Sequence, residues 1–286
     1  MSDALPESRL YTFIDESREF ALSFLEGQRL IHDLALLHAI QGSGFAYFRD
    51  TVLSVQPMIT FLKAGEQFGF YIDSTAPRFQ LKIETEHGGE TRCTLVPDSF
   101  RDFPEAMHGL VRVLKLFPGN RAPYESVLEA KGLALGEIVN RVLADSFQMH
   151  SVVRLSRESD QSALLHRLPA MSDHDRYADT REAVVQRSGE IENGLRELLS
   201  RAMTRPDEVR DAFAEAGFRL LASRPVRFRC NCSRPRMLAN VKSLGDETAR
   251  GLFDPGQEFI EITCEYCKQT YRVTRADLEG PPPRPH

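Results

Sequence analysis

The feature that most constrains the fold of this chain is a group of four cysteines near its C-terminal end. Cys230 and Cys232 form a C-x-C pair in RFRCNCSRPR, and Cys264 and Cys267 form a C-x-x-C pair in ITCEYCKQTYRV. Four thiolates in two close pairs are the ligand set of a tetrahedral zinc site. In an extended segment, a C-x-C pair places both sulfurs on one side of the backbone, because side chains alternate along a strand. The spacing therefore predicts a small zinc-binding fold.

The residues around the second pair predict two short strands. Phe259, Ile260 and Ile262 form an apolar alternation ahead of the pair, and residues 271–273 form another after it. We expect the C-x-x-C segment to be the turn between these strands, with both sulfurs curled inward. Residues 242–250, between the two cysteine pairs, predict a short polar helix.

The same four cysteines allow two plainer interpretations. One is a purely structural zinc ribbon, in which the metal replaces a core too small to fold alone. The other is a pair of local disulfides, which a reducing intracellular compartment disfavours. Structural ribbons mostly carry C-x-x-C on both arms, so the tighter first pair indicates a further role. Oxidation offers one, because each arm holds its two sulfurs close together.

The run R-C-N-C-S-R followed by C-E-Y-C resembles the zinc domain of the heat shock protein 33 family, redox-regulated and ATP-independent chaperones of the bacterial cytoplasm. The metal ligands of that family fall on the four cysteines, and Arg234 and Tyr266 also match. The match covers residues 226–278 and is fainter upstream. Lys268 departs from the family, which usually has glycine there, and glycine adopts a left-handed turn more easily.

The resemblance implies a mechanism and a set of partners. In the reduced protein the four cysteines hold Zn²⁺. After strong oxidation they form the disulfides Cys230–Cys232 and Cys264–Cys267, and the zinc leaves. The zinc domain and the linker before it then unfold, and the exposed apolar surface binds unfolding or oxidatively damaged client proteins. The disulfide pairing, this holdase activity and dimerisation on activation come from the resemblance alone, whereas the zinc dependence follows from the residues.

Length and composition are those of a globular protein without a membrane anchor. The chain has 286 residues, of which 42% are hydrophobic and 27% charged, so it can bury a sizeable core. Its net charge of −5 makes nucleic acid an unlikely main partner. The start, MSDALPESRL, lacks a secretory signal, and no apolar run approaches the about 18 residues of a membrane span. We therefore expect a cytoplasmic protein.

We expect an α+β fold made of several parts. Residues 1–171 are expected to form an N-terminal mixed α/β core domain, 172–222 a helical linker, 223–280 the C-terminal zinc domain and 281–286 a disordered tail. Helical periodicity predicts helices at 30–40 and 133–147. Apolar alternation predicts strands at 18–25, 68–72, 79–83, 91–96, 111–116, 124–129, 152–155 and 163–168, with Gly88-Gly89 as a hairpin turn.

The linker region has a different pattern from the core. A narrow apolar stripe at helical spacing contains Ile191, Leu195, Leu198 and Leu199, and two glycines within it each cost about 1 kcal/mol relative to alanine. A second amphipathic piece follows Pro206 and contains Val209, Phe213 and Leu220. These are either ordinary packed helices or a marginal linker that stays folded only while its stripe lies on a neighbouring surface.

No enzyme motif is convincing. Gly42-Ser-Gly44 begins like a dinucleotide loop, but Tyr47 occupies the place of the third glycine. A zinc hydrolase is poorly supported, because catalytic zinc keeps three protein ligands and an open position. Cys93 lies in a strand pattern and is expected to be a small core residue. His32 and His38 lie on a mostly apolar predicted helix and are expected to be structural. His150 and His166 are isolated, with no carboxylate partner at a motif spacing.

The main alternative function is a zinc-ribbon adaptor that binds protein or nucleic acid without a redox switch. Four arginines surround the first cysteine pair, but few aromatic residues are interleaved with them, so we expect a solvated face there. They are Arg227, Arg229, Arg234 and Arg236.

Overall fold

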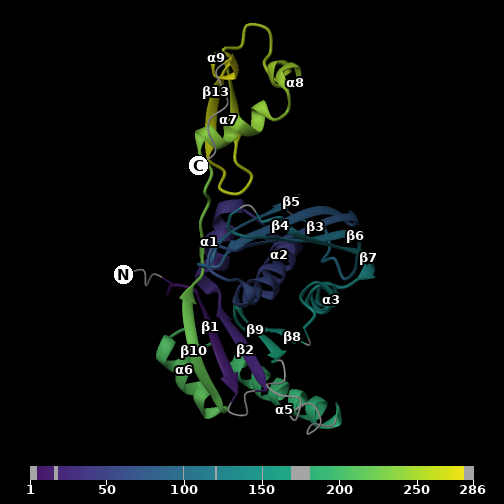
Figure 1. Ribbon diagram of the computed structural model, residues 1–286, viewed down its shortest axis with the longest axis vertical. Coiled ribbons are helices and arrows are strands. Elements are labelled where there is room, and N and C mark those ends of the chain that lie inside the picture. Colours follow the sequence, from purple (N-terminus) through teal and green to yellow (C-terminus); the bar gives the residue numbers. More distant parts are fainter. Residues whose placement is uncertain are drawn as a thin grey trace. The chain divides into compact units, whose positions relative to one another are not determined.

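The computed structural model describes residues 5–15, 19–98, 100–119, 121–149, 151–168 and 181–279, and for 181–188 it describes only the helical backbone. The chain divides into two compact units, Met1–Phe228 and Arg229–His286 (Figure 1). Both contain helices and strands, which confirms the predicted α+β class. The start of the expected linker, the expected disordered tail and His150 lie outside the described residues. Within them, no helix is both long and apolar enough to cross a bilayer.

The first unit contains two β-sheets whose strands are antiparallel, apart from the parallel pairing of β11 with β5. The five-stranded sheet has the order β10-β1-β2-β9-β8, with strands β1 (Arg9–Asp15), β2 (Phe20–Glu26), β8 (Ser151–Leu155), β9 (Gln161–Arg167) and β10 (Phe218–Pro225). The six-stranded sheet has the order β11-β5-β4-β3-β6-β7, with strands β3 (Gln67–Ala76), β4 (Arg78–Glu86), β5 (Glu90–Val96), β6 (Met107–Leu116), β7 (Tyr124–Leu133) and β11 (Arg227–Phe228).

Helices fill the space between the two sheets (Figure 1). The main apolar core joins residues of both sheets to residues of α1 (Gln28–His38), α2 (Gly42–Val55), the 3₁₀ helix η1 (Gln56–Phe61) and α3 (Leu135–Phe147). The predicted helices at 30–40 and 133–147 correspond to α1 and α3. The sequence did not predict α2, because this helix begins with Gly-Ser-Gly and glycine is a poor helix former. Its Tyr47 is buried against the rings of Phe79 and Phe103.

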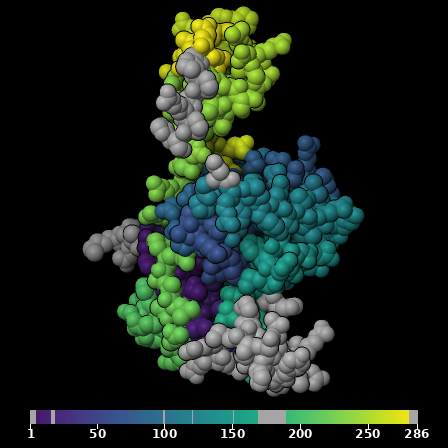
Figure 2. Space-filling model, viewed as in Figure 1, coloured from purple at the N-terminus to yellow at the C-terminus, as the bar shows by residue number. Residues whose placement is uncertain are grey.

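The other face of the five-stranded sheet is covered by α5 (Arg181–Ser200) and α6 (Pro206–Glu215) (Figure 1). The predicted stripe is buried here: Leu195, Leu198 and Leu199 pack in a second core with side chains of β1, β2 and β9. In Figure 2 the green surface around α6 lies beside the purple N-terminal strands. The stripe is therefore an integral part of the first unit in this state.

One part of the linker prediction is wrong. Leu220 was assigned to the second amphipathic helix, but α6 ends at Glu215 and Leu220 lies in strand β10. Gly217 adopts a positive φ of 83°, which glycine tolerates and which ends the helix. The following residues then pair with β1, in a register from Arg9↔Pro225 to Asp15↔Phe218. The boundary between the two compact units falls after Phe228, whereas the sequence predicted a domain boundary after residue 222.

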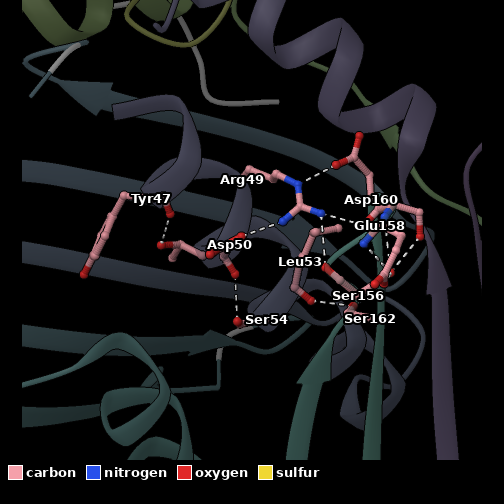
Figure 3. Close-up of polar contacts among 11 residues, drawn as sticks. Tyr47, Arg49, Asp50, Leu53, Ser54, Ser156, Glu158, Asp160 and Ser162 are labelled. Carbon is pink, nitrogen blue, oxygen red and sulfur yellow. Dashed lines mark hydrogen bonds and ion pairs between the residues drawn. The ribbon is translucent and has the colours of Figure 1, made fainter. Parts of the chain in front are cut away.

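A polar network fixes the turn between β8 and β9 (Figure 3). Arg49 of α2 donates to Asp160 Oδ1 at 2.6 Å and to the Ser159 carbonyl at 2.5 Å. The same turn holds the connection between α5 and α6. Ser156 Oγ donates to the Leu199 carbonyl at 3.0 Å, and Gln161 Nε2 donates to the Met203 carbonyl. These two hydrogen bonds, from Ser156 and Gln161, connect the five-stranded sheet to the helices that cover it.

The second unit is small. It contains a two-stranded sheet of β12 (Phe259–Thr263) and β13 (Thr270–Thr274), with α7 (Arg234–Lys242), α8 (Asp246–Gly251) and α9 (Arg275–Glu279). Both predicted strands are confirmed. The predicted helix at 242–250 is wrong in detail, because Gly245 at φ 86° separates the end of α7 from α8. The buried apolar cluster of this unit contains Phe253, Ile260 and Val273, with partly buried side chains packed against it, and Val241 and Ala249 are also buried. So small a core points to another source of stability.

Candidate metal centre

The first cysteine pair lies in the segment between β11 and α7. Helix α7 begins directly after it, with Ser233 as the N-cap, whose Oγ accepts from the Arg236 backbone amide at 3.4 Å. Pro235 in the first turn has no amide hydrogen to satisfy and suits a helix start. The S-R-P sequence thus starts a helix at a defined residue, directly after Cys230 and Cys232.

The second pair lies on the turn between β12 and β13. The Cys264 amide donates to the Gln269 carbonyl at 2.9 Å, and the Lys268 amide donates to the Cys264 carbonyl at 2.9 Å. Lys268 has a φ of 58°, so it takes the left-handed conformation for which glycine is the usual residue. The departure from the family pattern therefore leaves the shape of the turn in place, at a cost of about 1 kcal/mol.

The four sulfurs converge. Every pair of them lies within 4.8 Å, and all four thiols are free. Cys230 Sγ lies 3.8 Å from Cys264 Sγ, and Cys232 Sγ lies 3.2 Å from Cys267 Sγ. Four sulfurs placed about 2.3 Å from a tetrahedral zinc would be about 3.8 Å apart. The donor set and its spacing therefore fit a metal ion, and the four cysteines could hold one.

The thiols influence one another's ionisation. Burial and the hydrogen bond with Cys232 raise the pKa of Cys267 to about 12. At Cys232 burial also raises the pKa, but hydrogen bonds from Tyr271 and from the neighbouring thiols outweigh it and lower the pKa below its usual value. Of these two thiols, Cys232 therefore loses its proton more readily. A metal ion would replace the remaining protons, because cysteine ligates as the thiolate.

Tyr271 was predicted only as a strand residue. In the structure its hydroxyl lies 3.1 Å from Cys232 Sγ and 3.0 Å from Gln269 Oε1. Strand periodicity marks Tyr271 as part of β13 but says nothing about which residue of the distant first arm its hydroxyl meets. It is therefore a site residue that sequence reasoning missed.

The arginines around the first pair bind other groups of the protein. Arg234 Nη2 pairs with Asp277 Oδ2 at 2.5 Å, and its Nε donates to the Arg272 carbonyl at 3.0 Å. The Arg234 guanidinium, together with Thr274, lowers the pKa of Asp277 to about 2. Arg227 pairs with Glu90 at 3.0 Å, and Arg236 donates to the Asn231 carbonyl at 2.9 Å. Arg234 thus ties α7 to β13 and α9, which gives this residue of the motif a structural role.

The remaining candidates lie away from the sulfurs. Cys93 is fully buried in the main core and burial raises its pKa, which confirms the prediction of a core residue. Burial lowers the pKa of His166 to about 4. His38 is buried, and His32 lies 3.3 Å from Asp33 Oδ1 on an exposed face of α1. Gly42-Ser-Gly44 opens α2.

The comparison with known proteins points to a family. A family model described as Hsp33 protein matches residues 8–274. A 33 kDa chaperonin of Pseudomonas fluorescens is 30% identical over 214 residues, which are 72% of this chain and 70% of that protein. A 33 kDa chaperonin of Nitrosococcus oceani is 28% identical over 163 residues, which are 55% of this chain and 52% of that protein. The chain thus spans about half the length of this second relative.

A solved structure shares the fold. The crystal structure of a 33 kDa chaperonin (heat shock protein 33 homolog) from Thermotoga maritima superposes with a TM-score of 0.72. The alignment covers 96% of this chain and 97% of that chain, at 14% sequence identity. The α+β architecture is therefore common to both. Because the family model matches nearly all of the sequence, this chain belongs to the Hsp33 family.

Proposed function

We propose that this protein is a redox-regulated, ATP-independent holdase whose switch is a zinc ion held by Cys230, Cys232, Cys264 and Cys267. The observation that carries the proposal is the convergence of four free thiols in a unit with only a small apolar core. The 33 kDa chaperonin relatives support it. The proposed partners are unfolding or oxidatively damaged client proteins of the cytoplasm.

The second unit depends on the cysteines because its own core is too small. Bound zinc ties the two arms together, and in small zinc modules this contributes on the order of 10–16 kcal/mol of folding free energy. Full burial of one Val, Ile or Phe side chain contributes about 1.5–3 kcal/mol. The core of Phe253, Ile260 and Val273 cannot supply the difference once the entropy of ordering the unit is counted. Loss of the thiolates therefore unfolds the unit.

A peroxide supplies the oxidising chemistry in this proposal. One thiolate sulfur attacks a peroxide oxygen, the O–O bond breaks, and a sulfenic acid and hydroxide form. A second thiolate then attacks that sulfur, an S–S bond forms, and another hydroxide leaves. The formation of each disulfide thus transfers two electrons from a pair of thiolates to one peroxide. Joined sulfurs no longer carry the charge that holds a metal, so the site releases it. We propose the pairs Cys230–Cys232 and Cys264–Cys267, each formed between sulfurs within 4.8 Å.

The proposed client-binding surface is the interface between the five-stranded sheet and helices α5 and α6. Leu198 and Leu199 of α5 and Phe213 of α6 are buried there against Phe13 and Phe24 of the sheet. Release of the helices would expose apolar side chains on both partners, and contiguous apolar surface binds other apolar surface. Strand β10 leads from α6 to β11, which ends just before Cys230. Unfolding of the second unit would leave the short strand β11, whose two residues pair with β5, as the folded continuation of this edge strand.

The experiment follows zinc release and light scattering of a thermally unfolding client in the same tube, before and after peroxide. We expect suppression of aggregation only in the oxidised, zinc-free protein. A Cys93→Ala variant, which keeps the cluster, should respond in the same way. Equal suppression before and after oxidation would refute the switch. If peroxide releases no zinc, the zinc-ribbon adaptor becomes the better description. Disulfide mapping by mass spectrometry tests the pairing, and sedimentation tests dimerisation on activation.

A further inference from the structure

A tyrosine hydroxyl joins the two arms of the cysteine cluster. Tyr271 lies in β13, four residues after Cys267, and its backbone pairs with Ile262 of β12. Its hydroxyl reaches Cys232 Sγ of the first arm at 3.1 Å. The strand register places the Tyr271 backbone opposite Ile262, and the hydroxyl oxygen lies at hydrogen-bond distance from one particular sulfur.

The hydroxyl has one proton and two neighbouring acceptors. Gln269 Oε1 lies 3.0 Å from the Tyr271 oxygen, slightly closer than the sulfur at 3.1 Å. A thiolate has no proton to donate, so the sulfur of an ionised Cys232 can only accept. Hydrogen bonds to charged acceptors are stronger than those to neutral ones. Whenever Cys232 is ionised, the Tyr271 proton therefore points to the sulfur, and Gln269 is the weaker competitor.

We propose that Tyr271 is a positioning residue that holds the Cys232 thiolate in its ligating orientation and lowers its reactivity. A hydrogen bond occupies one sulfur lone pair and withdraws charge from the thiolate. The same lone-pair density is what attacks an oxidant or an alkylating reagent. Groups that hydrogen-bond to a metal ligand also orient it, and their loss commonly weakens metal binding by about 10–100-fold.

This inference rests on the proposed zinc-dependent function, because it assigns a role around the same cluster. It adds that the four cysteines are not equivalent, and that the difference is set by a residue outside the cysteine motif. Tyr271→Phe removes the hydroxyl and keeps the ring. Gln269→Ala removes the competing acceptor and leaves the hydroxyl directed at the sulfur. The two variants therefore predict different results, although both alter the same turn.

The experiment uses full-length protein in the wild-type, Tyr271→Phe and Gln269→Ala forms. In cobalt-substituted protein we expect Tyr271→Phe to move the sulfur-to-cobalt charge-transfer band to lower energy, and zinc to pass to a competing chelator about 10-fold more readily. Mass spectrometry then measures the alkylation rate of Cys232 relative to Cys264 in the same molecules. We expect this ratio to rise several-fold in Tyr271→Phe and to stay equal or fall in Gln269→Ala.

Two results would overturn the assignment. An unchanged band and an unchanged alkylation ratio in Tyr271→Phe would mean that the hydroxyl does not act on the sulfur. A similar acceleration of every cysteine in both variants would mean that the residues merely support the turn. The ratio is also measured in the reduced, metal-free protein at alkaline pH, where Cys232 is ionised with or without the hydroxyl, so Tyr271 is judged even if zinc does not bind. Absence of zinc binding in the wild type would instead refute the proposed function.

Discussion

The rings of Phe13 in β1 and Phe213 in α6 stack with their centroids 4.5 Å apart and an interplanar angle of 22°. Both side chains are fully buried, although 200 positions separate them in the sequence. The ring centroid of Phe213 also lies 5.1 Å from that of Phe24 in β2. This aromatic contact is the centre of the packing between the five-stranded sheet and the helices that cover it, and the proposed activation must break it.

Truncation of Phe213 should loosen these helices in the reduced protein. Phe213→Ala removes a buried ring, which costs about 3–5 kcal/mol of stability. We expect a lower free energy of unfolding in urea, increased binding of an apolar dye and client capture without oxidant. The matched control is Leu221→Ala in β10, because the Leu221 side chain is 51% exposed. A Phe213→Ala protein that needs oxidant as the wild type does would argue against this interface as the client-binding surface.

Glu26 should make stability depend on pH. The residue is 1% exposed, and its Oε2 has no hydrogen-bond partner among the described residues. Burial raises its pKa from 4.5 to about 7, the Gln28 backbone amide opposes this, and the Asp160 carboxylate adds to it. The groups that face it also include the Tyr11 hydroxyl. Because the folded pKa is the higher one, the stabilising effect is complete below pH 4.5 and is lost as the pH rises through about 7.

Glu26→Gln keeps the shape of the side chain and cannot ionise. We expect it to unfold at higher urea than the wild type at pH 8, with a gain on the order of 1–3 kcal/mol, and to differ little at pH 4.5. The exposed Glu215→Gln serves as the control. Wild-type and Glu26→Gln stabilities that run parallel between pH 4.5 and 8 would contradict the assignment.

Gly89, in the turn between β4 and β5, should be required where β11 joins the six-stranded sheet. It has a φ of 90°, and a Cβ there would collide with the carbonyl oxygen of Pro225. Its own carbonyl accepts from the Arg227 amide at 3.0 Å. We expect Gly89→Ala to lose about 1–3 kcal/mol of stability and to exchange the Arg227 amide hydrogen faster.

Gly88→Ala is the matched control for this position. A Cβ on Gly88 meets only the flexible carboxylate end of Glu90, and Gly88 does not have a positive φ. It should therefore exchange the Arg227 amide nearly as the wild type does. Equal protection of that amide in the two alanine variants would show that the Gly89 contact is dispensable.

Metal removal should unfold the second unit while the central strands of the five-stranded sheet in the first unit stay folded. A chelator under reducing conditions leaves four thiols within 4.8 Å, and their thiolate forms repel one another. We expect the amides of β12 and β13 to lose protection from hydrogen exchange, whereas those of β2 and β9 keep theirs. Cys264→Ser should give the same pattern. Protected β12 and β13 amides in the chelated protein would mean that the small core suffices.

Much of the fold was predictable because the signals are local. Apolar residues at helical spacing identified α1 and α3, and alternation identified β3, β4 and β5. The Gly88-Gly89 turn was recognised because such pairs are typical of hairpins. The cysteine pairs were predicted to form one cluster, since each pair lies within a few residues and zinc chemistry links them.

Local patterns in the sequence therefore establish the periodic elements and the donor atoms of the candidate metal centre. The folded structure is needed to show that residues 218–225 join the sheet through β1, that Glu26 is buried beside Asp160, and that the Tyr271 hydroxyl meets Cys232. The reason is physical: β10 forms the edge of the sheet by pairing with backbone groups of β1, which carry no side-chain signal, and a side chain's neighbours depend on residues far along the chain. Such pairings leave no periodic pattern in either segment.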